Sequence, residues 1–231
     1  MRTLIVNGGS IEDDFALDFL ANHRFDYILA ADRGMEFLLR VGILPDQIVG
    51  DFDSAREGLS EKFADRGVTV RRFRPQKDST DMEIAMETAL AAGSTEICVL
   101  GATGSRIDHV LGSIRNLSMA LNRGIPCCLV DAYNRIRMVD HGLTIGKEEQ
   151  YGKYISLLAH GGPVTGLTLE GFFYPLKNHV LSADSALGIS NEIVEKEGRI
   201  SFQGGKLLVI ESRDEKKSFA GRSDILSRGS R

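Results

Sequence analysis

Residues 97–130 read ICVLGATGSRIDHVLGSIRNLSMALNRGIPCCLV and contain a complete strand–turn–helix–strand unit. The apolar runs at 97–100 and 127–130 have the length and content of buried strands. Between them, apolar side chains recur at helical spacing and the pattern stops at a glycine. The residues of this pattern are Val110, Ile114, Leu117, Leu121 and Gly124. This order of elements predicts two parallel strands joined by a crossover helix.

The same alternation extends back to the start of the chain. Thr80 followed by Glu83 forms a capping box for a helix that ends at Gly93. We therefore expect an α/β N-terminal domain with a mainly parallel sheet over residues 1–139. Its other buried strands are predicted at 3–6, 27–30, 47–49 and 68–70.

The pattern changes after about residue 140. Short apolar segments are separated by Gly, Asn or Pro about every ten residues, without a helical period. Gly204 and Gly205 predict the two-residue turn of a hairpin. We expect an all-β sandwich C-terminal domain over residues 140–211 and a peripheral basic tail over 212–231. The predicted strands are 153–158, 164–169, 189–194, 199–202 and 206–210.

Composition limits the class of protein. The 231 residues carry a net charge of −4, which argues against a nucleic-acid partner. No apolar run is long enough to span a membrane, and the polar turn after residue 6 argues against a secretory signal. Cys98, Cys127 and Cys128 lie in apolar strand-like runs without metal-ligand spacing. Such cysteines are typical of reduced thiols, so we expect a cytoplasmic protein.

Acidic residues follow two of the predicted strands. Asp32 comes directly after residues 27–30, and Asp51 and Asp53 follow residues 47–49. In an extended segment both carboxylates of the second pair point the same way while Phe52 enters the core. Paired carboxylates suit Mg²⁺, which also binds phosphate oxygens and water. The alternative is a solvated turn in which Asp53 caps the next helix.

Further charged and glycine-rich residues follow the next strands. Lys77, Asp78 and Asp81 surround the predicted cap at Thr80, and a purely structural role explains Asp81 as a first-turn acid. The turn after residues 97–100 contains Thr103, Gly104, Arg106 and Asp108. Glycine-flanked turns at a helix start present N–H groups to phosphate, and an arginine adds a bidentate contact. Since ligands of open α/β sheets bind at the carboxyl ends of strands, we expect these groups at one rim.

These blocks resemble the thiamin pyrophosphokinase family. GDFDS at 50–54, KDSTD at 77–81, GATGSRIDH at 101–109 and SN at 190–191 match its motifs in order and approximate spacing. The resemblance covers residues 1 to about 211. It implies an N-terminal domain that binds ATP and Mg²⁺, a C-terminal β-sandwich, and a homodimer with thiamin at the subunit interface.

The resemblance also implies residue roles. Asp51, Asp53 and Asp81 match the family's metal-binding and pyrophosphate-handling acids, and Asp78 or Asp81 is the candidate that orients or deprotonates the thiamin hydroxyl. ATP and its phosphates are assigned to Asp32, Arg33, Gly34, Lys77, Thr103, Gly104, Arg106 and Asp108. Thiamin is assigned to Lys77, Tyr174, Ser190 and Asn191.

The aromatic residues near thiamin depart from the pattern of the eukaryotic members. Those members stack a Trp on thiamin, whereas this chain has no Trp. Tyr174 in the segment GFFYPL is the natural substitute. Strand alternation would place Phe172 and Tyr174 on one face and Phe173 on the other, in the sandwich core.

The expected function is transfer of the diphosphate group of ATP to thiamin, which gives thiamin diphosphate and AMP. Three alternatives stay open. A metal-dependent phosphohydrolase would use Asp51 as nucleophile and Asp53 as acid, although Ala55 departs from the usual pattern of that class. Some pterin diphosphokinases share the G-D-x-D-S block. A non-enzymatic nucleotide sensor would bind ATP without turnover.

Overall fold

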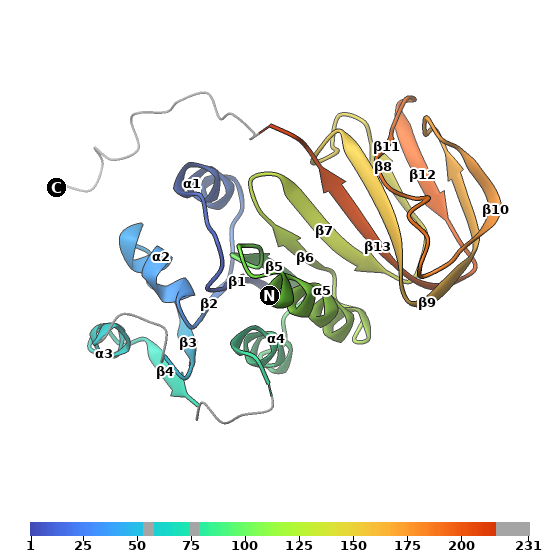
Figure 1. The fold of residues 1–231 in the computed structure, drawn as a ribbon. Coiled ribbons are helices and arrows are strands. Elements are labelled where there is room, and N and C mark those ends of the chain that lie inside the picture. The colour runs from blue at the N-terminus through green and yellow to red at the C-terminus, as the bar shows by residue number, and fades with distance from the viewer. Residues whose placement is uncertain (53–57, 74–78, 216–231) are drawn as a thin grey trace.

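A computed structural model describes residues 1–52, 58–73 and 79–215, in which an α/β part continues into a β-rich part (Figure 1). A parallel sheet forms the centre of the α/β part, with the strand order β4-β3-β2-β1-β5-β6. The predicted parallel sheet is therefore confirmed. Its strands are β1 (Arg2–Val6), β2 (Tyr27–Ala31), β3 (Gln47–Gly50), β4 (Thr69–Arg72), β5 (Glu96–Leu100) and β6 (Cys127–Val130).

The strand order reverses between β1 and β5. From β1 the chain builds outward through β2, β3 and β4, and then returns to place β5 and β6 on the other side of β1. The connections that leave the carboxyl ends of β1 and β5 consequently diverge to opposite faces. Such a switch point opens a crevice, which is the usual ligand site of an open α/β sheet.

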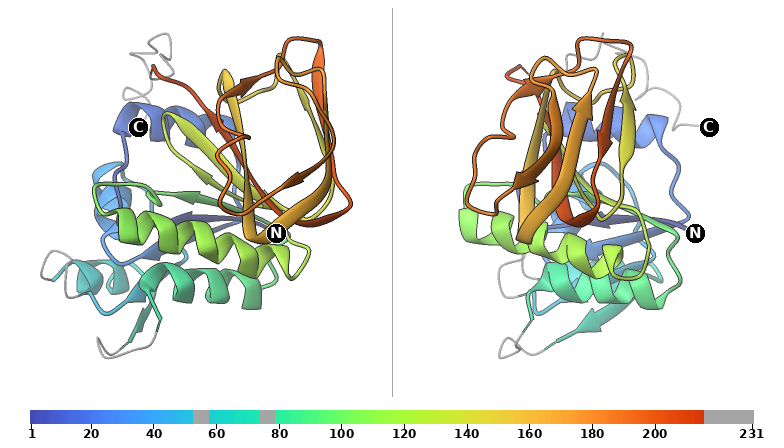
Figure 2. Two further views of the ribbon diagram at one scale, coloured as in Figure 1. Left: turned by 45° about the vertical axis from the view of Figure 1, so that its right-hand side comes forward. Right: turned by 90° about the vertical axis from the view of Figure 1, so that its right-hand side faces the viewer.

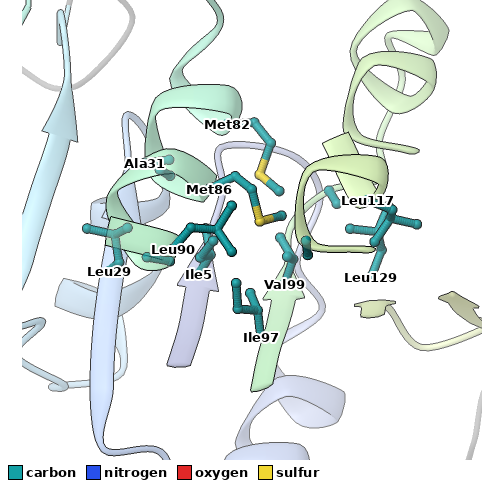
Figure 3. Close-up of a cluster of buried hydrophobic side chains, with 14 of the residues drawn as sticks. Ile5, Leu29, Ala31, Met82, Met86, Leu90, Ile97, Val99, Leu117 and Leu129 are labelled. Carbon is teal, nitrogen blue, oxygen red and sulfur yellow. The ribbon is translucent and has the colours of Figure 1, made fainter. Parts of the chain in front are cut away.

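Helices cover both faces of the parallel sheet (Figures 1 and 2). On one face α4 (Asp81–Ala91) and α5 (Ile107–Leu121) pack side by side, and on the other lie α1 (Asp13–Asn22), α2 (Gly34–Arg40) and α3 (Leu59–Ala64). Figure 3 shows Met82, Met86 and Leu90 of α4 directed at apolar side chains of the strands. Burial of this apolar face fixes the start of α4 at the carboxyl edge of the sheet.

The predicted helix boundaries follow from local chemistry. Thr80 Oγ1 accepts the N–H of Glu83 at 3.2 Å, so the hydroxyl half of the capping box is present. Gly93 and Gly124 end α4 and α5 with φ values of 83° and 69°, a conformation that favours glycine.

The β-rich part is a sandwich built around one long strand. The first half of β9 (Tyr154–Glu170) pairs with β13, whereas its second half pairs with β10 and β12 in the other layer (Figure 2). Buried apolar side chains from both layers meet between them. The remaining strands are β7 (Asn134–Val139), β8 (Leu143–Gly146), β10 (Leu176–Leu181), β11 (Asn191–Glu192), β12 (Glu197–Ser201) and β13 (Gly204–Ser212).

Residues 154–158 and 164–169 are strand as predicted, but they belong to the single strand β9 and not to two separate strands. The predicted strand at 189–194 was too long, because only Asn191–Glu192 is strand there. The predicted hairpin is also wrong, because Gly204 and Gly205 lie inside β13. A Cβ on Gly205 would lie 2.6 Å from the carbonyl oxygen of Pro163, so glycine permits close approach to the bend of β9.

The sheet is continuous between the two parts. β6 pairs with β7, β7 with β13, and β13 with β9, all antiparallel. Ser212 is the last residue of β13, and Tyr154 donates a hydrogen bond to Asp214 at 3.1 Å. The described fold thus continues past residue 211, and residues 216–231 of the predicted tail lie outside the described residues.

A buried carboxylate joins β13 to β7. The side chain of Glu211 is fully buried and accepts two hydrogen bonds from Arg135, at 2.7 and 2.8 Å, and one from Arg137 at 2.8 Å. Burial alone would raise the pKa of Glu211, but the bonds and charge of Arg135 and Arg137 outweigh it, so the pKa lies below its ordinary value. The ionised form is therefore favoured by folding.

We predict that Glu211→Gln lowers the free energy of unfolding by about 3 kcal/mol at neutral pH, because two guanidinium groups lose their counter-charge. A depressed folded-state pKa gives stability above the ordinary value of 4.5 that is lost as the pH falls further. The difference between wild type and variant should therefore shrink at pH 3.5 in urea titrations. Glu197→Gln, which breaks a surface pair with Arg199, serves as the matched control and should cost less than about 1 kcal/mol. An equal difference at both pH values would contradict this assignment.

Candidate active site

A cavity of about 760 Å³ opens at the switch point between β1 and β5. Four stretches of chain that follow or precede different elements contribute to its wall. Polar and apolar groups are mixed there, and backbone of glycine-rich turns forms part of the surface. The lining stretches lie within residues 7–11, 32–40, 80–82 and 101–113.

Two turns form one side of the cavity and are bonded to each other. The N–H of Gly9 donates to the carbonyl of Gly101 at 2.8 Å, and the N–H of Ser10 donates to the carbonyl of Thr103 at 2.7 Å. A Cβ on Gly9 would lie 2.3 Å from the Thr103 oxygen and 2.4 Å from the Gly101 oxygen. Only glycine fits this contact without displacing backbone.

Most of the described residues assigned to ATP from the sequence meet at this cavity. They follow two different strands, β2 and β5, at the carboxyl edge where the rule predicts ligand contacts. Asp81 starts α4 on the far wall. The predicted ATP residues that line the cavity are Asp32, Arg33, Thr103, Gly104, Arg106 and Asp108.

Gly34 has a packing role in this structure. It is buried and does not line the cavity. A Cβ at this position would lie 1.9 Å from the carbonyl oxygen of Val6. Gly34 therefore allows α2 to pack directly on the end of β1, and its assignment to ATP stays a prediction.

Asp51 lies at the end of β3, beside the strand end that carries Asp32. The N–H of Asp32 donates to the carbonyl of Val49 at 2.9 Å, which joins the two strand ends. Phe52 has a φ of 63°, so the backbone at this residue is not extended as the sequence predicted. Phe52 nevertheless packs against the core, as expected. Asp53, Lys77 and Asp78 lie outside the described residues.

Arg106 and Asp108 are already paired in this structure. The guanidinium Nη2 lies 2.6 Å from Asp108 Oδ2, and both side chains are largely exposed. The bond from Arg106 holds the pKa of Asp108 below its ordinary value. A phosphate that binds Arg106 would thus compete with Asp108 or share its guanidinium.

Carboxylates are the hard oxygen donors that suit Mg²⁺. Asp32 and Asp81 line the cavity, and Asp51 follows the neighbouring strand. Among the described residues no group of three or more His, Cys, Asp or Glu side chains has metal-binding geometry. Mg²⁺ is commonly held by one or two carboxylates together with substrate phosphates, and this donor set is of that kind.

The turn of Asn7, Gly8, Gly9 and Ser10 lines the cavity but was not assigned to the site from the sequence. It directly follows β1, so the rule used for the other strand ends would have found it. Arg40 also lines the cavity, held by a bidentate pair with Asp13 at 2.6 and 2.9 Å. Nothing local in the sequence predicts that pair, because it joins the end of α2 to the start of α1.

Comparison with known proteins gives a consistent assignment. Residues 20–129 match the family model "Thiamin pyrophosphokinase, catalytic domain" and residues 140–207 match "Thiamin pyrophosphokinase, vitamin B1 binding domain". Thiamine pyrophosphokinase of Bacillus subtilis is 34% identical over 186 residues, which cover 80% of this chain and 87% of that protein. The chain belongs to the thiamin pyrophosphokinase family.

Solved structures of the family share the fold. The crystal structure of thiamine pyrophosphokinase from Bacillus subtilis has a TM-score of 0.82 at 33% identity, covering 93% of this chain and all of that one. The enzyme from Geobacillus thermodenitrificans has a TM-score of 0.79 at 34% identity, with 93% and 99% covered. Yeast thiamin pyrophosphokinase, at 19% identity, shares the fold with a TM-score of 0.76, covering 91% of this chain and 86% of that one.

The described residues assigned to thiamin, Tyr174, Ser190 and Asn191, belong to the sandwich and do not line the cavity. Tyr174 and Phe173 are 63% and 61% exposed and contact each other edge-on, with ring centroids 4.8 Å apart. Phe172 is buried in the sandwich core and Phe173 is not, so the prediction that Phe173 is the core residue was wrong. Gly171 has a φ of 77°, and only Phe172 of this stretch forms an isolated bridge, so regular strand alternation does not hold.

Asn191 and Ser190 differ in their surroundings. The buried Asn191 accepts the N–H of Tyr174 at 3.0 Å and donates to its carbonyl at 2.8 Å. Its amide thus fixes the backbone that carries the exposed Tyr174 ring. Ser190 is exposed with a φ of 57°, and its N–H donates to Ser156 at 3.0 Å.

We predict that Gly34→Ala lowers the free energy of unfolding by about 1–3 kcal/mol, because the new methyl group overlaps the Val6 carbonyl. Gly112→Ala in α5 is the matched control. Apart from its chain neighbours and the backbone of its own helix, no described atom lies within 4 Å of the place that its new methyl group would take. Alanine should therefore stabilise the helix by about 0.5–1 kcal/mol. Urea unfolding of both variants measures the difference. Equal stability of the two variants would contradict the packing role of Gly34.

Proposed function

We propose that the protein transfers the diphosphate group of ATP to the primary hydroxyl of thiamin, giving thiamin diphosphate and AMP. The observation that carries this proposal is the match of both halves of the chain to the two domains of one family. The cavity at the switch point supports the ATP half, because its turns and the start of α5 offer N–H groups for phosphates.

The chemistry requires charge neutralisation and alignment of two substrates. The thiamin hydroxyl attacks the β-phosphorus and AMP leaves, so negative charge moves along the phosphate chain. We assign ATP and its phosphates to Asp32, Arg33, Thr103, Gly104, Arg106 and Asp108, together with Lys77. The carboxylate of Asp81 or Asp78 orients the hydroxyl or accepts its proton.

We assign Mg²⁺ to Asp51, Asp53 and Asp81. When bound, Mg²⁺ would neutralise the charge of the transferred diphosphate. The acidic character of these residues and their positions after β3 and at the start of α4 support the assignment. We also propose a cytoplasmic location, supported by three free cysteines. No helix in the described chain is long and apolar enough to cross a membrane.

We assign residues 1–139 to ATP and 140–211 to thiamin and dimer formation, with 212–231 as an extension. Tyr174, Ser190, Asn191 and Lys77 are the proposed thiamin residues, with Asn191 acting through the backbone of Tyr174. None of the first three lines the cavity. Exposed apolar side chains near them, among them Phe173, Leu187 and Ile189, support a homodimer in which a second copy completes the thiamin site.

The alternatives gain no support from the comparisons. A phosphohydrolase, a pterin diphosphokinase and a nucleotide sensor each explain the acids after β3, but none accounts for a vitamin B1 binding domain over residues 140–207.

Phosphorus NMR of protein, ATP, Mg²⁺ and thiamin tests the function directly. We expect AMP and thiamin diphosphate to form together. Asp51→Asn should reduce the rate about 100- to 1,000-fold through lost charge stabilisation. Asp46→Asn, at the amino edge of the same sheet, is the matched control and should turn over normally. Release of ADP or inorganic phosphate in place of AMP would contradict the proposal.

We expect Tyr174→Ala to raise the KM for thiamin about 2- to 30-fold, because the aromatic face loses its contact with the thiazolium cation. The KM for ATP should stay unchanged, since Tyr174 lies outside the cavity. Tyr174→Trp should retain thiamin affinity. Steady-state kinetics with each substrate varied in turn measures both KM values. An unchanged KM for thiamin in Tyr174→Ala, or an equal rise in both KM values, would refute the role of Tyr174.

A further inference from the structure

The hydroxyl of Thr103 has a partner outside the cavity. Thr103 Oγ1 donates to Asp131 Oδ2 at 2.8 Å. Because the hydroxyl proton is used in this bond, the side chain presents only lone pairs to other groups. Phosphate oxygens are also acceptors, so in this arrangement Thr103 does not donate to phosphate through its side chain. Its contribution to the cavity is backbone.

Asp131 is anchored by its own turn after β6. Its Oδ1 accepts the N–H groups of Tyr133 at 2.8 Å and of Asn134 at 2.7 Å, and the Asn134 side chain donates to both oxygens at 3.1 and 3.2 Å. The phenol of Tyr151 donates to the carbonyl of Asp131. Burial raises the pKa of Tyr151, which keeps this donor neutral. The carboxylate is therefore held from several directions, with its acceptor sites filled.

Thr103 is consequently fixed at two points. Asp131 holds its side chain, and the N–H of Ser10 holds its carbonyl at 2.7 Å. Since the C=O and N–H of one peptide unit point in opposite directions, the N–H of Gly104 points away from Ser10. Gly104 and Ser105 line the cavity, and the bonds of Thr103 to Asp131 and Ser10 fix the position of the turn that carries them.

We propose that Asp131 is a positioning residue for nucleotide phosphates, which acts through Thr103 to hold the turn at residues 101–105. This inference rests on the proposed function in one respect: it assumes that ATP binds in the cavity. Asp131 does not line that cavity. It holds in place the backbone donors that a phosphate would meet, and such fixed donors lose little freedom on binding.

The test compares variants that remove one side of the Thr103–Asp131 bond. Thr103→Val keeps the shape of the side chain and removes its hydroxyl, whereas Thr103→Ser keeps the hydroxyl. Asp131→Asn keeps one oxygen, which can still accept the N–H groups of Tyr133 and Asn134. The matched control is Thr3→Val, which breaks a buried hydroxyl bond to Ser94 at the amino edge of the sheet. Calorimetry with α,β-methylene-ATP and Mg²⁺ gives Kd, steady-state kinetics gives both KM values, and thermal unfolding gives Tm.

We expect Thr103→Val and Asp131→Asn each to weaken the analogue about 10-fold and to raise the KM for ATP similarly, with the KM for thiamin unchanged. Thr103→Ser should restore binding, and the double variant Thr103→Val/Asp131→Asn should bind no worse than either single variant, because both remove one interaction. Thr3→Val should lower Tm without changing Kd.

Normal binding by Asp131→Asn, or additive losses in the double variant, would overturn the proposal and assign the Thr103 hydroxyl an independent role. Changes in Kd that merely track Tm, as in a purely structural role, would overturn it as well. Failure of the proposed function has a different signature: the wild type binds the analogue but makes no thiamin diphosphate, and the comparison of Kd values remains valid.

Discussion

The contact between the turns that follow β1 and β5 constrains the whole site. Gly9 lies against two carbonyl oxygens at distances that leave no room for a Cβ, and two N–H···O bonds join the turns. This contact holds the turn that leads into α1 against the turn that leads into α5, and the two turns form one wall of the cavity. The opposite walls, at Asp32 and Asp81, follow from parallel strands whose carboxyl ends share one edge. A shift of the first contact would move the backbone donors relative to the acids.

Much of the fold follows from local patterns in the sequence. Every predicted strand of the parallel sheet is present, and α4 begins at its predicted cap because Thr80 satisfies the N–H of Glu83. The sandwich was predicted as a class but not in its pairing. β9 runs through both layers. The sequence Gly204-Gly205 resembles a hairpin turn, but Gly205 instead lets β13 approach the backbone of residues 163–164 closely. Pairing between distant segments depends on packing that no local window contains.

The candidate site was predictable to the extent that it follows strand ends. Asp32, Asp81 and the turn at residues 101–105 were found by that rule, and the turn at residues 7–10 obeys it too. Gly34 and Asn191 illustrate the limit, because the sequence does not show that Gly34 packs on Val6 or that Asn191 bonds the backbone of Tyr174. The Arg40–Asp13 pair and the Thr103–Asp131 bond join residues 27 and 28 positions apart, so tertiary structure alone reveals them.

The two parts of the chain share more than a linker. Glu211 of β13 bonds Arg135 of β7 and accepts the N–H of Tyr151 at 2.9 Å, while the phenol of Tyr151 reaches the carbonyl of Asp131 at the end of β6. Tyr151 and β13 of the sandwich are thus bonded to the turn that follows β6. Because these groups are bonded in series, the position of the turn at residues 101–105 depends on residues from both parts.

Amide hydrogen exchange with and without α,β-methylene-ATP and Mg²⁺ tests most directly whether the two joined turns form the nucleotide site. Bound phosphates should slow exchange in residues 7–11 and 103–109, whereas residues 164–181 of the sandwich should exchange as in the free protein. Thiamin alone should leave the two turns unaffected. Protection confined to the sandwich, or unchanged exchange in both turns at saturating analogue, would contradict the account.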